Sequence, residues 1–285
     1  MENRAHKDYR EQLEALGKLV REAYEEGDLR AIAAAVGAPI EQEVKLKEIT
    51  TLLLQQVDLK PGEEPKFTKR PKVEAYYIDD SGEAVATALG KEEVTFPFVI
   101  ISANPMIPVR VLKHGNVGQL LDYAKAAGEA IRKKRDAKTI SVFLAAVQDD
   151  MNVACTGGSL TDAALNEAIS LLEDKELKPK YIVMRGSRFN DVRAFSLPGQ
   201  IASELVAKGI IGSYAGAQFL LTSQMPADKV LIVPEQKVGK WAVREPLQTD
   251  PIEQKTKFMT GWLVWEEAAF GITNPDWIAC VTITA

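Results

Sequence analysis

The sequence offers few residues whose types and spacing could perform catalysis. It has two histidines, His6 and His114, and two cysteines, Cys155 and Cys280. Cys155 and His114 could form a thiol–imidazole dyad, but neither lies in a recognisable nucleophile motif. The motifs HExxH, GxxxxGKS/T, GxGxxG, GxSxG and SxxK are absent from the sequence. We therefore predict no catalytic residue, no metal ligand and no cofactor site, and we expect the two isolated cysteines to be buried thiols.

Paired carboxylates are the other residues that could do acid–base chemistry. They occur at Glu92-Glu93, Asp149-Asp150 and Glu266-Glu267. Adjacent residues point apart on helices and on strands, so the two carboxylates of a pair cannot share one substrate atom. We expect each pair to lie on the solvated surface.

Two glycine-rich segments could in principle form anion sites. Thr156-Gly157-Gly158-Ser159 precedes a predicted helix from Leu160, with Ser159 or Thr161 as the N-cap. The start of a helix can bind an anion, but a flexible joint between two parts of the fold is the commoner use of such a segment. Gly209 ends a predicted helix over 200–208 and is therefore typical of a C-cap.

Composition narrows the function further. The 285 residues include 35 Lys and Arg against 40 Asp and Glu, a net charge of −5. This balance excludes a strongly basic nucleic-acid-binding protein, because no chain-wide positive field is present. No run of about 18 apolar residues exists, and the N-terminus has no apolar signal core, so we expect neither a membrane span nor secretion.

The N-terminal 60 residues favour short amphipathic helices. Apolar residues recur every three or four positions from Tyr9 to Ala23. Gly27 should end this helix and Asp28 cap the next, which Gly37-Ala38-Pro39 should end. A third helical pattern runs from Glu41 to Val57. These helices could form a small core or an arm that packs on another surface.

An extended hairpin is predicted after the breaker at 60–65. The pattern changes to an alternation of two, and Asp79-Asp80-Ser81-Gly82 favours a turn between the two strands. A two-stranded ribbon is marginal in water by itself, so this hairpin needs a partner surface. We expect inter-subunit contacts at its tip, through Tyr77, Asp79, Asp80, Ser81, Gly82 and Glu83.

One long helix is predicted from Val117 to Asp149, about 50 Å in length. Its middle carries a basic segment, Arg132, Lys133, Lys134, Arg135 and Lys138. The segment is interpreted either as a solvated face, which we favour, or as a contact for nucleic acid or an acidic partner subunit.

Helices and strands alternate in the rest of the chain. Helices are predicted over 160–174 and 200–208, and strands over 181–184, 218–221, 229–233, 238–244, 255–267 and 277–284. Asn274-Pro275-Asp276 should turn the chain before the last strand. Trp262 and Trp265 should face opposite sides of their strand, one buried and the other near a subunit contact.

This order of parts resembles the major capsid proteins of tailed phages, the Hong Kong 97-type capsid fold that encapsulins share. The matching features are the N-terminal arm, the hairpin over 67–98, the long helix, the segment TGGSLTDAALNEAISLLEDKELKPKYIVM and the ending KFMTGWLVWEEAAFGITNPDWIACVTITA. The resemblance covers about residues 60–285. It implies an α+β fold with an N-terminal helical arm (1–66), an extended hairpin loop (67–98), a peripheral domain with the long spine helix (99–154 and 249–285) and an axial domain (155–248).

The resemblance also implies a function. It suggests a non-enzymatic shell protein, without cofactor, that self-assembles as pentamers and hexamers around double-stranded DNA. Scaffold, portal and decoration proteins would be its partners, the host cytoplasm its place of assembly and the virion its location. An encapsulin shell enclosing a cargo enzyme is the second reading. The third is a soluble α/β enzyme that uses Cys155 or a carboxylate.

Overall fold

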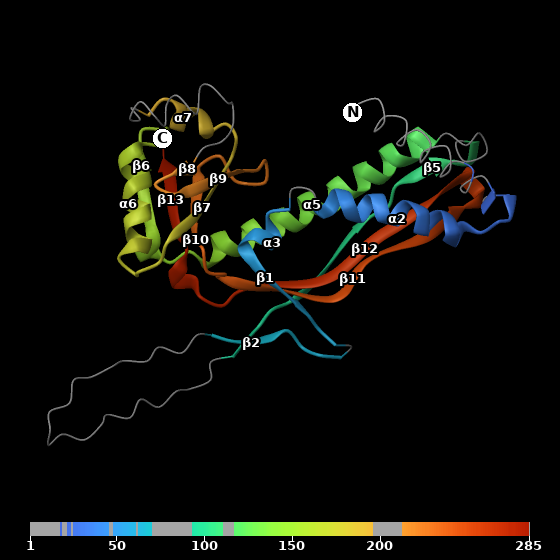
Figure 1. Ribbon diagram of the computed structural model, residues 1–285, viewed down its shortest axis with the longest axis horizontal. Coiled ribbons are helices and arrows are strands. Elements are labelled where there is room, and N and C mark those ends of the chain that lie inside the picture. The colour runs from blue at the N-terminus through green and yellow to red at the C-terminus, as the bar shows by residue number, and fades with distance from the viewer. Residues whose placement is uncertain are drawn as a thin grey trace, which may run out of the picture. The chain divides into compact units, whose positions relative to one another are not determined.

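The computed structural model describes residues 18, 22, 23, 25–45, 48–60, 62–69, 93–110, 117–195 and 213–284. The chain divides into two compact units, each built from separate stretches of sequence (Figure 1). Unit 1 comprises 1–50, 98–138 and 243–268, and unit 2 comprises 51–97, 139–242 and 269–285. The predicted tip of the hairpin, Tyr77 to Glu83, lies outside the described residues, as does the predicted helix over 200–208.

In unit 1, helix α2 (Leu29–Lys45) begins where the sequence predicts. Asp28 caps it, because its Oδ1 accepts hydrogen bonds from the backbone N–H groups of Arg30 and Ala31 at 3.1 Å each. The predicted end at 37–39 is wrong, because the helix continues through Pro39. Val36, Ile40 and Val44, four residues apart, are all buried, and burial of this stripe outweighs the cost of an internal proline.

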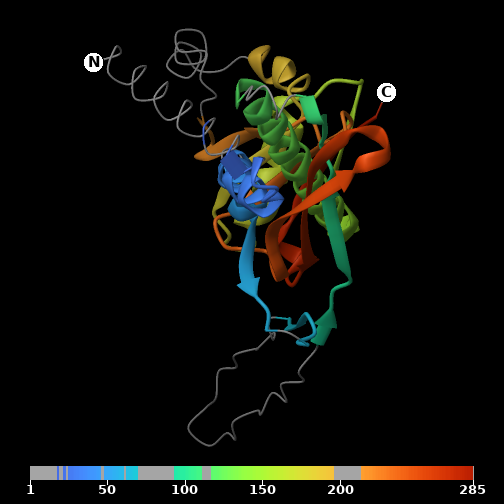
Figure 2. The same cartoon turned by 90° about the vertical axis from the view of Figure 1, so that its right-hand side faces the viewer.

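Helix α5 (Val117–Ala146) confirms the predicted long helix, although it ends three residues early. Its first part lies beside α2 in unit 1 (Figures 1 and 2). The two helices approach closely at Gly128, where an added Cβ would lie 2.8 Å from the carbonyl oxygen of Ile40. Only glycine permits this approach.

The third predicted helix, 41–57, is not one continuous helix, and its end is wrong. Helix α3 spans only Thr50–Leu53, and Leu54–Asp58 forms strand β1. β1 pairs with β11 (Gly239–Gln254) at one edge of a five-stranded sheet, which continues through β12 (Met259–Ile272) to β4 (Phe98–Ala103), with β5 (Met106–Pro108) also on β12. Pairing with β11 decides the conformation of residues 54–58, since sheet formation depends on cross-strand neighbours.

The Trp pair on β12 faces opposite sides, as predicted. Trp262 is only 2% exposed, whereas Trp265 is partly exposed and its indole N–H donates to Asp250 Oδ2 at 2.7 Å. Its role in a subunit contact remains a prediction.

Unit 2 is built on a six-stranded mixed sheet. The strands, in spatial order, are β6 (Asn152–Thr156), β13 (Ala279–Thr284), β10 (Lys229–Pro234), β7 (Pro179–Met184), β9 (Ala217–Leu221) and β8 (Ser213–Tyr214). Helix α6 (Asp162–Glu173) packs on it and the short α7 (Phe189–Arg193) adds Phe189 and Val192 to the same core (Figure 1). Helix α6 and strands β7, β9, β10 and β13 confirm the segments predicted there, whereas β6, α7 and β8 are not among the predicted segments.

The C-terminal strand lies inside the sheet of unit 2. β13 pairs in parallel with β6 and antiparallel with β10, so residues 279–284 belong to the sheet of unit 2. Val281 and Ile283 of β13 are buried in the core of unit 2, and this burial determines the place of the strand.

Short 3₁₀ segments complete the described chain. They span Asp149–Met151, Lys255–Lys257 and Pro275–Trp277. The last one forms the predicted turn at Asn274-Pro275-Asp276. Thr161 is the N-cap of α6, accepting from the N–H of Ala164 at 3.3 Å, which decides between the two predicted caps.

Candidate functional site

The base of the predicted hairpin is present in unit 2. Strands β2 (Lys66–Thr68) and β3 (Glu93–Thr95) pair antiparallel, with Phe67 opposite Val94. The ring of Phe67 contacts that of Phe96, with centroids 5.4 Å apart, and the ammonium of Lys240 lies 4.6 Å from the Phe67 centroid. Both phenylalanines are buried, so the hairpin base is anchored on its own chain.

Gly271 of β12 makes this anchorage possible. A Cβ at position 271 would lie 2.1–2.2 Å from three ring atoms of Phe96. The ring therefore occupies the volume that any other side chain would need. A glycine in a strand is a sequence signal for such close approach, but the sequence does not say which ring approaches.

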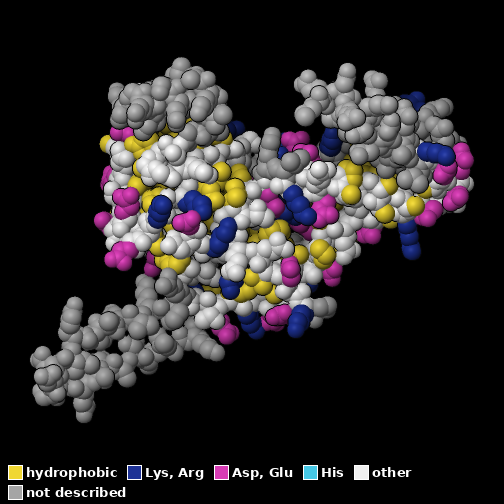
Figure 3. Space-filling model, viewed as in Figure 1, with side chains coloured by type: hydrophobic (Ala, Val, Ile, Leu, Met, Phe, Trp, Pro, Cys, Tyr) yellow, Lys and Arg dark blue, Asp and Glu magenta, His cyan; other side chains and the backbone are white. Residues whose placement is uncertain are grey.

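The predicted basic segment of α5 does not form one surface. Lys133 and Lys134 are exposed and Arg132 and Lys138 are partly exposed, but Arg135 is 4% exposed. The expectation of a solvated or partner-binding face is therefore wrong for Arg135. On the face seen in Figure 3, basic and acidic side chains are interspersed.

Arg135 joins three parts of unit 1. Its Nε donates to Glu266 Oε1 at 2.9 Å, its Nη2 donates to Glu266 Oε2, and its Nη1 donates to Glu48. Glu266 lies on β12 and Glu48 lies between α2 and α3. The bidentate pair with Glu266 fixes the guanidinium plane.

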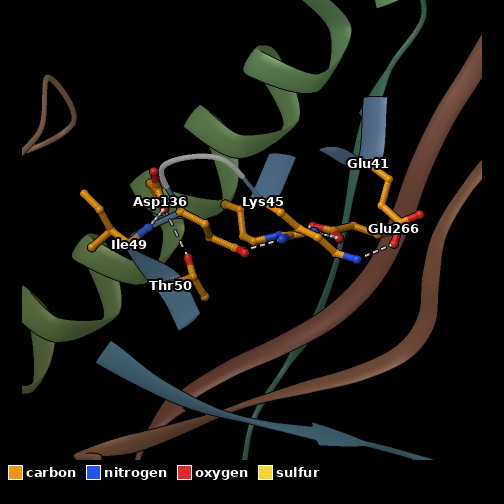
Figure 4. A network of polar contacts seen from close by, with 8 residues as sticks. Glu41, Lys45, Ile49, Thr50, Asp136 and Glu266 are labelled. Atoms are coloured by element: carbon orange, nitrogen blue, oxygen red, sulfur yellow. Dashed lines mark hydrogen bonds and ion pairs between the residues drawn. The ribbon is translucent and has the colours of Figure 1, made fainter. Parts of the chain in front are cut away.

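Asp136, the next residue on α5, binds the same N-terminal segment. Figure 4 shows its carboxylate directed at Ile49 and Thr50. Its Oδ1 accepts from the backbone N–H of Ile49 at 3.1 Å and from the Thr50 hydroxyl at 3.3 Å. Asp136 thereby caps the start of α3, because the first N–H groups of a helix have no partner within it. We call Glu48, Arg135, Asp136 and Glu266 the buried cluster.

Burial and charge act in opposite directions within the buried cluster. Desolvation raises the pKa of Glu48 and outweighs the lowering by Arg135. Desolvation likewise raises the pKa of Asp136, against the hydrogen bonds from Ile49 and Thr50 and the charge of Arg132. Burial by itself lowers the pKa of Arg135, but Glu266 and Glu48 together raise it above its usual value. Arg135 thus stays charged while two carboxylates of the buried cluster resist ionisation.

The expectation that the pair Glu266-Glu267 lies on the solvated surface is wrong for Glu266. Glu266 is buried at 1% exposure, and Glu267 instead accepts from Arg244 at 3.1 Å. The residues do point apart, but one points inward. No signal in the sequence connects Glu48, Arg135 and Glu266, which are far apart along the chain, so sequence reasoning missed the buried cluster.

The candidate nucleophile lies in a packed environment. Cys155 and Cys280 are both buried free thiols, as expected. The Cys155 thiol donates to the carbonyl oxygen of Ser159 at 3.2 Å and lies 3.5 Å from the Thr161 hydroxyl. Burial raises the pKa of Cys280, which disfavours its thiolate. His114 lies outside the described residues.

The described residues contain neither a metal site nor a membrane-spanning helix. Among these residues, no group of His, Cys, Asp and Glu side chains is arranged to hold a metal ion. None of the helices described is both long and apolar enough to span a membrane.

The structure is similar to subunits of known protein shells. The virus-like particle from Pyrococcus furiosus matches over 86% of this chain and 97% of its own, with 17% identity and a TM-score of 0.59. The mature capsid of bacteriophage PhiM1 matches over 83% and 87%, with 10% identity and a TM-score of 0.62. The capsid of a native GTA particle matches over 83% and 90%, with 15% identity and a TM-score of 0.63. No family model and no curated protein sequence matches the chain.

These structures define the class of fold. Elements from both units take part in matches that cover more than four fifths of this chain. The chain therefore has the Hong Kong 97-type capsid fold, which confirms the resemblance seen in the order of its parts.

Proposed function

We propose that the protein is a structural shell subunit, the major capsid protein of a tailed double-stranded DNA phage. Copies of the chain would assemble as pentamers and hexamers into a closed icosahedral shell. The observation that carries this proposal is a match to capsid subunits along nearly their whole length, 87% and 90% of two of them. A structural rather than catalytic role agrees with the packing of Cys155 and the ion pairing of Glu266.

The family's finer organisation is part of the proposal. We infer that 1–66 acts as an arm, 67–98 as the extended loop, 99–154 with 249–285 as the peripheral domain, and 155–248 as the axial domain. Scaffold, portal and decoration proteins would be further partners. Assembly in the host cytoplasm and a final location in the virion follow from the same function.

Two sets of residues are proposed as inter-subunit contacts. The first is the hairpin tip, Tyr77, Asp79, Asp80, Ser81, Gly82 and Glu83. The second is the exposed remainder of the basic segment, of which Lys133 already pairs with Glu129 at 2.7 Å. Lys134 and Lys138, one helical turn apart, are the better candidates for an acidic partner subunit.

Assembly is tested by expressing the full chain and measuring its mass by light scattering and its form by negative-stain electron microscopy. A shell subunit should give megadalton particles with closed outlines, since obligate interfaces are large. A monomer or small oligomer at high concentration would refute the proposal and favour the third reading, a soluble enzyme.

An encapsulin is the second candidate function. The match that spans 97% of the subunit of the Pyrococcus furiosus virus-like particle is consistent with either function. The contents of particles purified from the native source discriminate between the two: double-stranded DNA supports the phage capsid, and a single loaded enzyme supports the encapsulin.

The hairpin tip provides a sharper test. Deleting residues 77–83 should leave a folded subunit that no longer assembles, because these residues would contact a neighbour. Circular dichroism measures the fold and light scattering the assembly. A variant with a Gly/Ser loop of equal length separates the loss of side chains from the loss of length. Closed shells formed by both variants would contradict the proposed contact.

A further inference from the structure

The buried cluster contains more acid than base. Glu48, Asp136 and Glu266 bring three carboxylates, and Arg135 is the buried cation between two of them. Arg132 acts on Asp136 from the preceding turn of α5 but is itself partly exposed. Buried charges are costly unless each has a partner of opposite sign, so complete ionisation of this cluster is unfavourable.

Among the residues that the structure describes, the neighbouring charged groups supply no second buried cation. In the N-terminal segment, Lys45 is exposed and pairs with Glu41 at 2.6 Å. On the sheet side, Arg244 of β11 binds Glu267, the neighbour of Glu266. The charged groups that act on Glu48 are therefore Arg135, Asp136 and Glu266, two of them of its own sign.

The same cluster holds the N-terminal segment in place. Glu48 binds Arg135, and Ile49 and Thr50 bind Asp136, so three consecutive residues attach to two adjacent positions of α5. The preceding helix α2 packs on α5 at Gly128. We call the described residues 28–45 and 48–53 the strap. Detaching the strap would expose Glu48 and Asp136 to water, where their carboxylates ionise freely.

We infer that the buried cluster is a proton-coupled latch: the strap docks on α5 with uptake of protons by the cluster, so docking is tighter at acidic pH and loosens as the pH rises. This inference goes beyond the proposed function and holds for the single subunit, whether or not it forms a shell.

The direction follows from linkage. Desolvation raises the pKa of Glu48 and Asp136 above their ordinary values of 4.5 and 3.8 in the docked state. A docked state with raised pKa values binds more protons than the detached state. Its stability is therefore greatest below the ordinary values and falls as the pH rises through the raised ones. Each unit of raised pKa changes the docking constant about 10-fold.

Hydrogen exchange of the full chain tests the latch. The opening constant of the α2 amides, corrected for the intrinsic exchange rate, is compared at about pH 4, near the ordinary pKa values, and at about pH 8. In the native sequence it should increase several-fold at the higher pH. A constant that is equal at both pH values, or smaller at pH 8, overturns the inference.

Matched variants assign the effect to the buried cluster. Glu48→Gln removes the charge with little change in shape. It should reduce the increase of the opening constant with pH, and its opening constant at pH 8 should not exceed that of the native chain. Glu41→Gln, on the exposed face of α2, should leave this increase unchanged. If Glu48→Gln does not fold, Asp136→Asn provides the same comparison, since its amide oxygen can still accept from Ile49. A full increase in the cluster variant, or an equal reduction in Glu41→Gln, contradicts the assignment.

Discussion

At the scale of the residue, two basic side chains of α5 differ in their burial. Lys133 and Arg135 are two positions apart in one basic run, but only Arg135 faces inward, where Glu48 and Glu266 bind it. Two residues on a helix are separated by about 200°, so one basic run must contribute to more than one face. Burial, rather than charge, distinguishes the residue that stabilises the fold from those that meet solvent.

Replacing Arg135 with Met should be strongly destabilising. The substitution leaves Glu48 and Glu266 buried without their cation, and removing one partner of a buried ion pair costs about 3–5 kcal/mol. The free energy of unfolding measured in urea at neutral pH checks this prediction.

Lys133→Met is the matched control on the same helix. Its exposed pair with Glu129 contributes about 0.3–0.5 kcal/mol, so the variant should be nearly as stable as the native chain. Equal losses in the two variants would show that the buried cluster contributes nothing specific.

At the scale of the element, close backbone approach determines how the hairpin base sits on its sheet. β2 and β3 form only a two-stranded sheet, which is marginal by itself. Phe67 and Phe96 compensate by burying their rings, and Gly271 leaves room for one of them. The stability of the hairpin base therefore depends on a residue in β12, far away in sequence.

Gly271→Ala should destabilise this packing by about 1–3 kcal/mol, because the added methyl group overlaps the buried ring of Phe96. Thermal unfolding and hydrogen exchange of residues 66–68 and 93–95 measure the effect.

Gly37→Ala is a control variant for which we expect the opposite change in stability. Gly37 lies within α2, and its Cβ would meet Thr249 Oγ1 at an ordinary 3.6 Å. Alanine is favoured over glycine within a helix by about 0.5–1 kcal/mol, so this variant should be more stable. A loss of stability in Gly37→Ala as large as that in Gly271→Ala would contradict the role given to the Phe96 contact.

At the scale of the whole molecule, the charge balance constrains any interaction with nucleic acid. The net charge is −5, and the visible face of the structure mixes both signs. A wall that encloses DNA without holding it is consistent with this balance, since affinity for DNA arises mainly from neutralised phosphates.

The subunit should therefore bind a short DNA duplex no more tightly than about 10⁻⁴ M at physiological salt, the weak limit of nonspecific binding. Fluorescence anisotropy with a labelled duplex measures this affinity. Micromolar binding that weakens steeply with added salt would instead assign Lys134 and Lys138 to a nucleic-acid contact, and Lys134→Gln with Lys138→Gln would then abolish it.

Local sequence determined most of the elements. The cap at Asp28, the long helix from Val117, helix α6 and strands β7, β9, β10 and β13 follow from capping, periodicity and residue type, which act within a few residues. The order of these elements was enough to indicate the capsid fold.

Only the tertiary structure decided the rest. α2 passes through Pro39 because its apolar stripe is buried, residues 54–58 form a strand because β11 pairs with them, and β13 lies beside β6 in the sheet of unit 2. The buried cluster unites Glu48, Arg135 and Glu266 from three distant segments. Each of these features depends on a partner far along the chain, and periodicity, which describes only a residue's near neighbours, contains no information about that partner.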